Sequence, residues 1–155
     1  MDGRQIDKIL SQDVITAPIF QGVFSADTIP PLKAKSAIVV NQDESSQPGS
    51  HWLAMYVDKD NNLEFFDSYG QSPFLYGKFI RDYVSKYSNV SWNSIAFQSI
   101  TSNACGLYCI YFILKRCQGK SMFSIIQNLY ENKRNDFQIY QFVKKKYGVR
   151  FVFRK

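Results

Sequence analysis

Short runs of apolar residues separated by polar segments recur along this 155-residue chain. Runs of about 4–8 apolar or β-branched residues between turn-forming residues are typical of strands in a buried sheet. On this pattern we expect strands at residues 35–41, 52–57, 63–67 and 94–98. The polar segment 58–62 has the composition of a turn and predicts a hairpin between the second and third of these strands. Residues 16–31, interrupted by Gly22 and Pro30-Pro31, are expected to be mostly loop.

Other segments repeat their apolar residues with the period of an α-helix. They predict helices at residues 4–11, 74–87, 105–117, 121–130 and 135–147. The segment 105–117 is apolar almost all round, which indicates a buried central helix. Thr101, Ser102 and Asn103 precede it and offer side chains of the N-capping type. Gly148 is expected to end the last helix, and residues 149–153 are expected to form a final short strand.

These elements predict an α+β fold, with a small mixed β-sheet wrapped by helices. A chain of this length can bury a core of its own, and 45% of its residues are hydrophobic, which is a globular composition. No clear boundary or repeat divides the sequence. We therefore expect residues 1–155 to form a single domain.

The composition excludes several classes of protein. No apolar stretch approaches the roughly 18 residues needed to cross a bilayer, and the first residues lack the apolar run of a signal peptide. The odd number of cysteines, Cys105, Cys109 and Cys117, fits a reducing compartment and a protein that is not secreted. A zinc site is not expected, because the chain has one histidine and no CxxC pair.

The net charge of +6 is distributed unevenly. From residue 115 onward there are eleven Lys and Arg against two acidic residues, whereas the part before it has eight against eleven. This excess of positive charge has two readings, a solvated surface or a surface that binds a polyanion. The last twelve residues alternate cations with aromatic residues, which favours the second reading and a contact with DNA or RNA. The candidate nucleic-acid-binding residues are Lys144, Lys145, Lys146, Arg150, Arg154 and Lys155.

The single histidine, His51, limits the catalytic chemistry to one base of this kind. Cys105 is expected at the N-terminus of the central helix, where free N–H groups and the positive helix end stabilise an anion. That position, with an imidazolium beside it, lowers a thiol pKa from its usual value of about 8.5. His51 opens the second predicted strand and is the candidate base that takes the thiol proton and returns it to the leaving amine. Gly106 then leaves room for a substrate backbone beside Cys105.

Two further residues complete the candidate site. Asp67 closes the strand that pairs with the one opened by His51, so both fall at the open end of the hairpin, and Asp67 is the candidate acceptor that orients the imidazole. Gln98 ends a predicted strand shortly before Cys105, and its amide can donate to a tetrahedral oxyanion together with the Cys105 N–H. Each residue alone has an ordinary structural explanation, and the case rests on the four together.

At this point the motifs resemble a known family. The matching residues are Gly49-Ser50-His51-Trp52, Phe66-Asp67-Ser68-Tyr69-Gly70, Gln98 and Cys105-Gly106-Leu107-Tyr108-Cys109. They are similar to adenain, the maturation protease of adenoviruses, with relatives in virophages and polinton-type elements. Residues 22–27 and 36–41 extend the resemblance, which covers roughly residues 5–118. The ubiquitin-like-protein deconjugating proteases share the core of this pattern.

The resemblance implies an adenain-like cysteine protease fold and cleavage of viral capsid or core precursors, often at small Gly-containing motifs, inside assembling particles. In this comparison, Asp67 stands at the position where adenoviral members usually carry Glu. The resemblance also implies DNA and a short viral peptide as activators, with no metal or small-molecule cofactor. The chain has no cysteine before Cys105 that could tether such a peptide. Trp52, beside the base, either walls a narrow substrate cleft or packs in the core.

Three functions follow as alternatives: an endopeptidase of virion maturation, a protease that removes ubiquitin-like modifiers, and a nucleic-acid-binding protein that keeps the fold without catalysis. The short chain and its basic end favour the first, and the complete set of four candidate residues argues against the third. We expect a monomer that acts in the virion and at the site of virus assembly, without a membrane partner.

Overall fold

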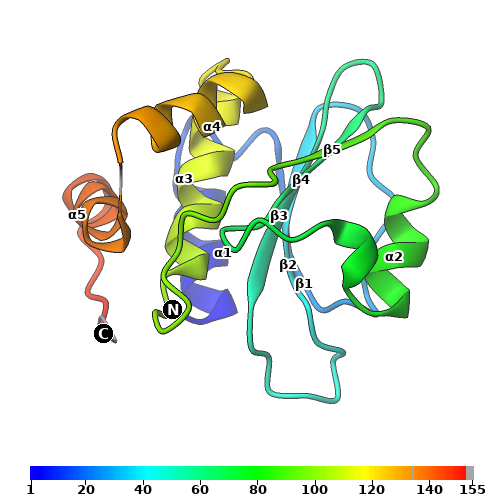
Figure 1. The fold of residues 1–155 in the computed structure, drawn as a ribbon, viewed down its shortest axis with the longest axis horizontal. Helices are drawn as coiled ribbons and strands as arrows, with labels where there is room; N and C mark the ends of the chain where they lie inside the picture. The colour runs from blue at the N-terminus through cyan, green and yellow to red at the C-terminus, as the bar shows by residue number, and fades with distance from the viewer. Residues whose placement is uncertain (134, 153–155) are drawn as a thin grey trace.

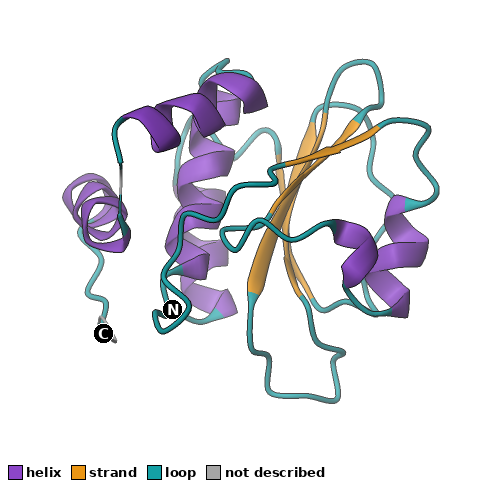
Figure 2. Ribbon diagram, viewed as in Figure 1, coloured by secondary structure: helices purple, strands orange, loops and turns teal. Residues whose placement is uncertain are grey.

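A computed structural model describes residues 1–133 and 135–152. In the described part, a five-stranded sheet lies between helices on both faces (Figures 1 and 2). The elements are, in chain order, α1 (Gly3–Gln12), β1 (Phe20–Phe24), β2 (Ser36–Asn41), β3 (Trp52–Val57), β4 (Leu63–Phe66), the 3-10 helix η1 (Pro73–Leu75), α2 (Lys78–Val84), β5 (Val90–Trp92), α3 (Cys105–Cys117), α4 (Met122–Glu131) and α5 (Asp136–Tyr147). The expected α+β class with a small mixed sheet is confirmed.

The sheet follows the order of the chain, β1-β2-β3-β4-β5. The outer pairs are parallel and the inner pairs antiparallel. The β3–β4 pair is the expected hairpin, in which Val57 lies opposite Leu63 and Ala54 opposite Phe66. This register directs the residue before β3 and the residue after β4 to the same end of the sheet.

Side chains alternate between the two faces of the central strands and form two cores. On one face, Val39, Ala54 and Phe66 pack with α1, α3, α4 and α5. On the other face, Ile38 and Met55 pack with α2. Helix α3 is buried along Cys105–Leu114, as its apolar sequence predicts, and it lies between the sheet and helices α4 and α5 (Figure 1).

Several predictions about individual elements were wrong. Strand β1 lies inside the expected loop 16–31. The prediction missed it because this five-residue edge strand contains Gly22, at φ +135°, and has no continuous apolar run. The strand expected at residues 94–98 does not form, and the chain instead forms β5 at Val90–Trp92. There the Asn93 side chain binds the backbone of Asp67 and of Ile95, and the chain leaves the sheet.

The helix ends also differ from the prediction. The expected helix 74–87 is divided, because η1 is followed by Gly77, and α2 begins only after it. The N-cap of α3 is Ala104, which has no side-chain hydrogen bond, rather than Thr101, Ser102 or Asn103. Gly148 ends α5 in the left-handed conformation, as predicted. Residues 149–152 are not in a strand, and residue 153 of the predicted strand lies outside the described residues.

Candidate active site

Asp67 follows β4 and is fully buried. Its Oδ1 accepts from His51 Nε2 at 2.7 Å and from the Tyr69 N–H at 2.9 Å. Its Oδ2 accepts from the Tyr76 hydroxyl at 2.6 Å and from the Gln71 N–H at 3.0 Å. Burial alone would raise the pKa of this carboxyl, but the hydrogen bonds from His51 and Tyr76 outweigh it and lower the pKa. Asp67 is therefore ionised and held by four donors.

His51 precedes β3 and is 4% exposed. Its ring stacks on Tyr69 at 4.5 Å between centroids and lies 6.4 Å from that of Tyr76. Because Nε2 faces Asp67, Nδ1 is the nitrogen left for Cys105. Burial lowers the pKa of the imidazole, but the hydrogen bonds with Asp67 and Cys105 and their charges prevail and raise it to about 9. The ring is thus protonated at neutral pH and oriented by its neighbours.

Cys105 is the first residue of α3, the helix that packs against β3. Burial raises the pKa of its thiol, but the hydrogen bond with His51, the imidazolium charge and the N–H groups of Trp52 and Gly106 outweigh it and lower the pKa. A lowered thiol pKa beside a raised imidazole pKa describes a thiolate–imidazolium pair. Burial raises the pKa of Cys117 to about 11 and that of Cys109 well above its ordinary value. Among the three cysteines, Cys105 has the chemistry of a nucleophile.

Gln98 lies in a loop rather than at the end of a strand, and its side chain is nonetheless fixed. The Ser68 hydroxyl donates to Gln98 Oε1, and Gln98 Nε2 donates to the Ser102 carbonyl at 3.0 Å, three residues before Cys105. The N–H groups of Phe97 and Gln98 both donate to the Ser68 carbonyl, at 2.8 and 3.0 Å. Donation to an oxyanion by the Gln98 amide stays a prediction.

Gly70 makes this pairing of loops possible. It has φ +73°, and a Cβ there would lie 2.7 Å from the carbonyl carbon of Ile95 and 2.8 Å from the Ala96 nitrogen. Only glycine allows the segment after Asp67 to pass this close to the segment before Gln98. The loop 68–71 therefore links the two candidate residues.

Trp52 and Gly106 pack against the start of the chain. The Trp52 indole donates to the Met1 carbonyl at 3.2 Å. A Cβ on Gly106 would meet Ile6 Cδ1 at 3.1 Å and Trp52 Cδ1 at 3.4 Å. The space that Gly106 leaves is filled by α1 and Trp52 of the same chain, so packing between α1 and α3 accounts for this glycine. Substrate contact by Trp52, or by the Gly106 backbone, stays a prediction.

The sequence interpretation missed three groups that hold this site: Tyr76, Asn93 and the ring of Tyr69. Asn93 accepts from the Asp67 N–H at 2.9 Å and donates to the Asp67 carbonyl. Tyr69 was visible only as part of a motif, and its stacking on His51 follows from the turn after Asp67. No sequence signal pointed to Tyr76 or Asn93, because both reach Asp67 through a loop.

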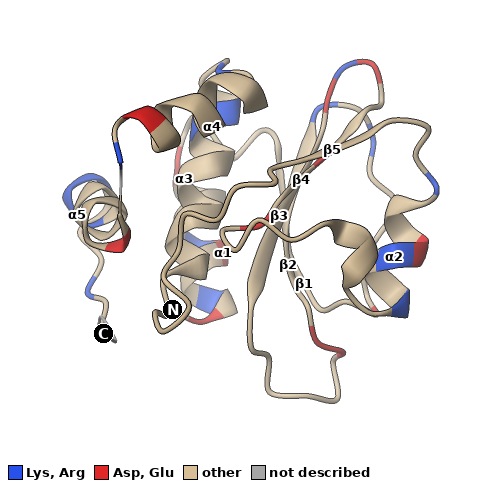
Figure 3. Cartoon of the chain, viewed as in Figure 1, with Lys and Arg blue, Asp and Glu red and all other residues tan. Residues whose placement is uncertain are grey.

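Lys and Arg occur on several elements, and the described candidate nucleic-acid-binding residues lie on α5 and the segment after it (Figure 3). Lys144, Lys145 and Lys146 form the last turn of α5, and these residues and Arg150 are exposed. Arg154 and Lys155 lie outside the described residues. The Lys144 ammonium stands 5.7 Å from the Tyr140 ring centroid, and that of Lys146 stands 5.6 Å from the Tyr147 ring. This arrangement suits a polyanion and equally a solvated surface.

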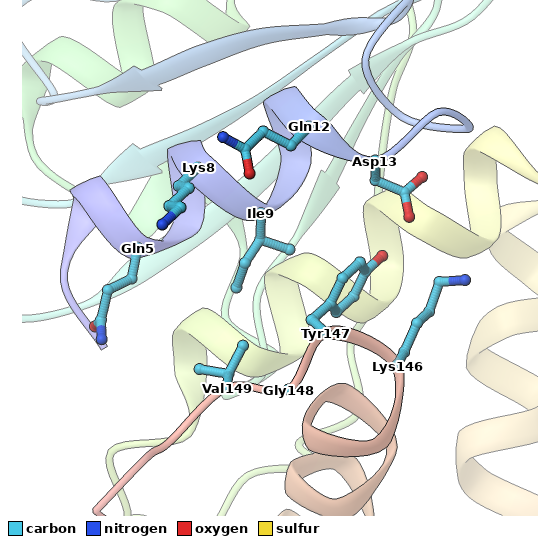
Figure 4. Close-up of a pocket in the computed structure, with 9 residues that line it drawn as sticks. All are labelled: Gln5, Lys8, Ile9, Gln12, Asp13, Lys146, Tyr147, Gly148 and Val149. Atoms are coloured by element: carbon cyan, nitrogen blue, oxygen red, sulfur yellow. The ribbon is translucent and has the colours of Figure 1, made fainter.

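A cavity of about 420 Å³ lies between α1 and the end of α5 (Figure 4). Lys8 and Lys146 line it, and the Tyr147 side chain points toward Asp13. None of its nine lining residues is a candidate catalytic residue. Within residues 1–133 and 135–152, no group of three His, Cys, Asp or Glu side chains is arranged to hold a metal ion, and no helix has the length and apolar character needed to cross a membrane.

Comparison with known proteins found similarity to viral proteins in both sequence and fold. No protein-family model matches the chain. The chain is 36% identical over 101 residues to R355 of Acanthamoeba polyphaga mimivirus, provisionally named a thiol protease, in a match that covers 59% of this chain and 33% of that protein. The chain thus spans about a third of its curated relative's length.

Two crystal structures of the ASFV pS273R protease share the fold. One has a TM-score of 0.63 and 20% identity and covers 91% of this chain and 64% of that chain. The other, the selenomethionine form, has a TM-score of 0.51 and 23% identity and covers 75% and 45%. The resemblance to viral cysteine proteases, expected from the motifs around His51 and Cys105, is confirmed, and the fold is that of the pS273R protease.

Proposed function

We propose that this chain is a viral cysteine endopeptidase with Cys105 as nucleophile and His51 as general acid–base. The observation that carries the proposal is the position of His51 between two partners. Its Nε2 donates to the buried Asp67 carboxylate at 2.7 Å, and its other nitrogen interacts with Cys105 and lowers the pKa of that thiol. A buried thiolate–imidazolium pair serves nucleophilic catalysis at neutral pH.

The reaction follows from these groups. The Cys105 thiolate attacks the scissile carbonyl carbon, and the C=O electrons move to oxygen, where the Cys105 N–H and the Gln98 amide stabilise the oxyanion. As the C–N bond breaks, the imidazolium of His51 gives its proton to the leaving amine. Water then attacks the thioester and gives a proton to His51, and collapse of the second intermediate releases the carboxylic acid and restores the pair.

The proposed substrates are capsid or core precursor proteins of a virus, cleaved during particle maturation at small, Gly-containing motifs. Trp52 directly follows His51, and the proposal places its ring beside the scissile bond, where a narrow cleft would admit only glycine. The direct test is incubation of the purified chain with the capsid and packaging proteins encoded beside it, followed by mass mapping of the cut sites. We expect discrete cuts with the native chain and none with Cys105→Ala.

The alternative is a protease that removes ubiquitin-like modifiers, whose core motif is similar. The same experiment with ubiquitin-like conjugates separates the two. Release of a modifier with no cleavage of the precursors would support the alternative. Cleavage of both substrate types by the Cys105→Ala variant would instead point to a contaminant and remove the assignment.

We also propose that DNA activates the enzyme through Lys144, Lys145, Lys146 and Arg150, and that a short viral peptide can act as a second, untethered activator. The exposure of these four cations, three in the last turn of α5 and one just after it, supports the first part. Added DNA should raise turnover, and raising the salt concentration should cancel the effect, because counterion release weakens phosphate contacts. Turnover that ignores both DNA and salt would leave the basic end as a solvated surface.

A further inference from the structure

Asp136 is a buried carboxylate that the proposed catalytic set does not use. It is the first residue of α5, where an acidic side chain normally faces solvent and favours the helix dipole. Here it is 6% exposed and points toward α3 and the loop that carries Gln98. A carboxylate is seldom buried without donors that compensate for the lost water, so its partners are informative.

Both oxygens of Asp136 contact the surroundings of Gln98. Its Oδ2 accepts from the Ser99 N–H at 3.2 Å. Its Oδ1 lies 2.9 Å from the Tyr108 hydroxyl, one turn beyond Cys105 on α3. The same hydroxyl lies 3.1 Å from the Phe97 carbonyl. Burial and the Asp136 charge raise the pKa of Tyr108, so the hydroxyl remains a donor.

The residues on both sides of Gln98 are therefore tied to helices that come later in the chain. Phe97 is held by Ser68 on one side and by Tyr108 on the other, and Ser99 is held by Asp136. Residues 94–98 do not pair with a strand. The hydrogen bonds to Phe97 and Ser99 therefore hold this loop in place of the strand pairing that the sequence pattern predicts. A side-chain amide acts as an oxyanion donor only when its backbone is held in place.

We propose that Asp136 is a positioning residue that, through Tyr108 and Ser99, holds Gln98 at the oxyanion site. The inference rests on the proposed protease function. It gives the C-terminal helix α5 a part in catalysis that does not depend on its basic residues.

The test separates steps that need an oxyanion donor from those that do not. Peptide hydrolysis passes through a tetrahedral oxyanion, whereas alkylation of Cys105 by iodoacetamide is a displacement at carbon that forms none. Asp136→Ala should lower kcat by about 10–100-fold, less than or equal to the roughly 10²–10³-fold expected for Gln98→Ala, with KM little changed. The alkylation rate of Cys105 should stay at the native value in both variants.

Four further variants guard against a merely structural effect. Tyr108→Phe removes one hydroxyl and should lower kcat in the same direction, and Asp136→Asn, which keeps the shape and one acceptor, should recover part of the activity lost in Asp136→Ala. In the double variant with Gln98→Ala, removal of Asp136 should cost nothing more, because residues acting as a unit are not additive. Glu131→Ala, which removes an exposed carboxylate at the end of α4, is the matched control and should keep native turnover.

The inference is overturned if Asp136→Ala and Tyr108→Phe keep native kcat, if turnover and alkylation fall together, or if the losses of Asp136→Ala and Gln98→Ala are additive. Failure of the proposed function looks different. In that case the native chain itself cleaves no precursor, whatever its Cys105 alkylation rate.

Discussion

His51 Nε2 and Asp67 Oδ1 lie 2.7 Å apart, at the open end of a hairpin whose two strands place them there. Asp67 is fully buried and also holds the Tyr76 hydroxyl and two backbone N–H groups. These contacts therefore fix the position of the imidazole. They also determine which of its two nitrogens faces Cys105. Rigid support of this kind allows a weak base to act on a thiol without reorganisation during the reaction.

Cys105 should react with alkylating agents far faster than the other two cysteines near neutral pH. The His51 imidazolium lowers its thiol pKa, whereas burial raises those of Cys109 and Cys117. Timed labelling with iodoacetamide, followed by peptide mass mapping, measures the three rates. Equal labelling of the three cysteines would contradict an activated thiolate at Cys105.

The rate of proteolysis should follow a bell-shaped dependence on pH. The thiol pKa of Cys105 is lowered, so the acid limb should lie below the ordinary thiol value of about 8.5. The pKa of His51 is raised to about 9, so activity should fall as the pH rises through about 9 and the imidazolium loses the proton needed by the leaving amine. The two apparent pKa values describe the coupled Cys105–His51 pair as a whole. They are obtained by measuring kcat/KM as a function of pH. An acid limb at or above 8.5 would argue against the pair.

Asp67→Asn should lower kcat/KM by about 10²–10⁴-fold, the range typical of a lost acid–base function. The amide cannot supply the negative charge that raises the pKa of His51, so the alkaline limb should also move to lower pH. Asp60→Asn, at the exposed turn end of the same hairpin, is the control and should leave both quantities unchanged. A normal alkaline limb in the Asp67 variant would exclude the proposed charge effect.

Gly70→Ala should destabilise the fold more than the matched variant Gly148→Ala. Both glycines have a similar positive φ, +73° and +67°, and this strain costs an alanine about 1–2 kcal/mol. At Gly148 no atom of the described residues lies within 4 Å of the added Cβ, whereas at Gly70 the Cβ would lie 2.7 Å from the backbone of Ile95. We expect a loss of about 3 kcal/mol or more for Gly70→Ala, measured by denaturant unfolding. Equal losses would mean that the two loops do not pack as closely as described.

The parts of the site that could be predicted are those set by neighbours in the chain. The turn at residues 58–62 and the apolar runs on either side of it determine the register of one hairpin, and that register carries His51 and Asp67 to the same end. The apolar run after Cys105 likewise predicts a buried helix with the cysteine at its start. In both cases the signal is local, because hydrophobic periodicity and turn composition act over only a few residues.

Gln98 shows where this reasoning stops. Residues 94–98 have the apolar content of a strand, but Asn93 and Gly70 let the segment bind the loop after Asp67 instead of β4. Its position depends on Ser68, about thirty residues earlier, and on Asp136, almost forty residues later. Contacts between residues this far apart in the chain leave no periodic pattern in the sequence.

The sequence by itself thus determined the strands of the hairpin, the central helix and the pairing of one base with one thiol, since each follows from the local pattern of apolar and polar residues. The tertiary structure alone decided what supports them. Tyr76, Asn93 and Asp136 are ordinary polar residues in the sequence, and they become part of the site because burial forces each polar atom to find a partner among segments that folding brings together.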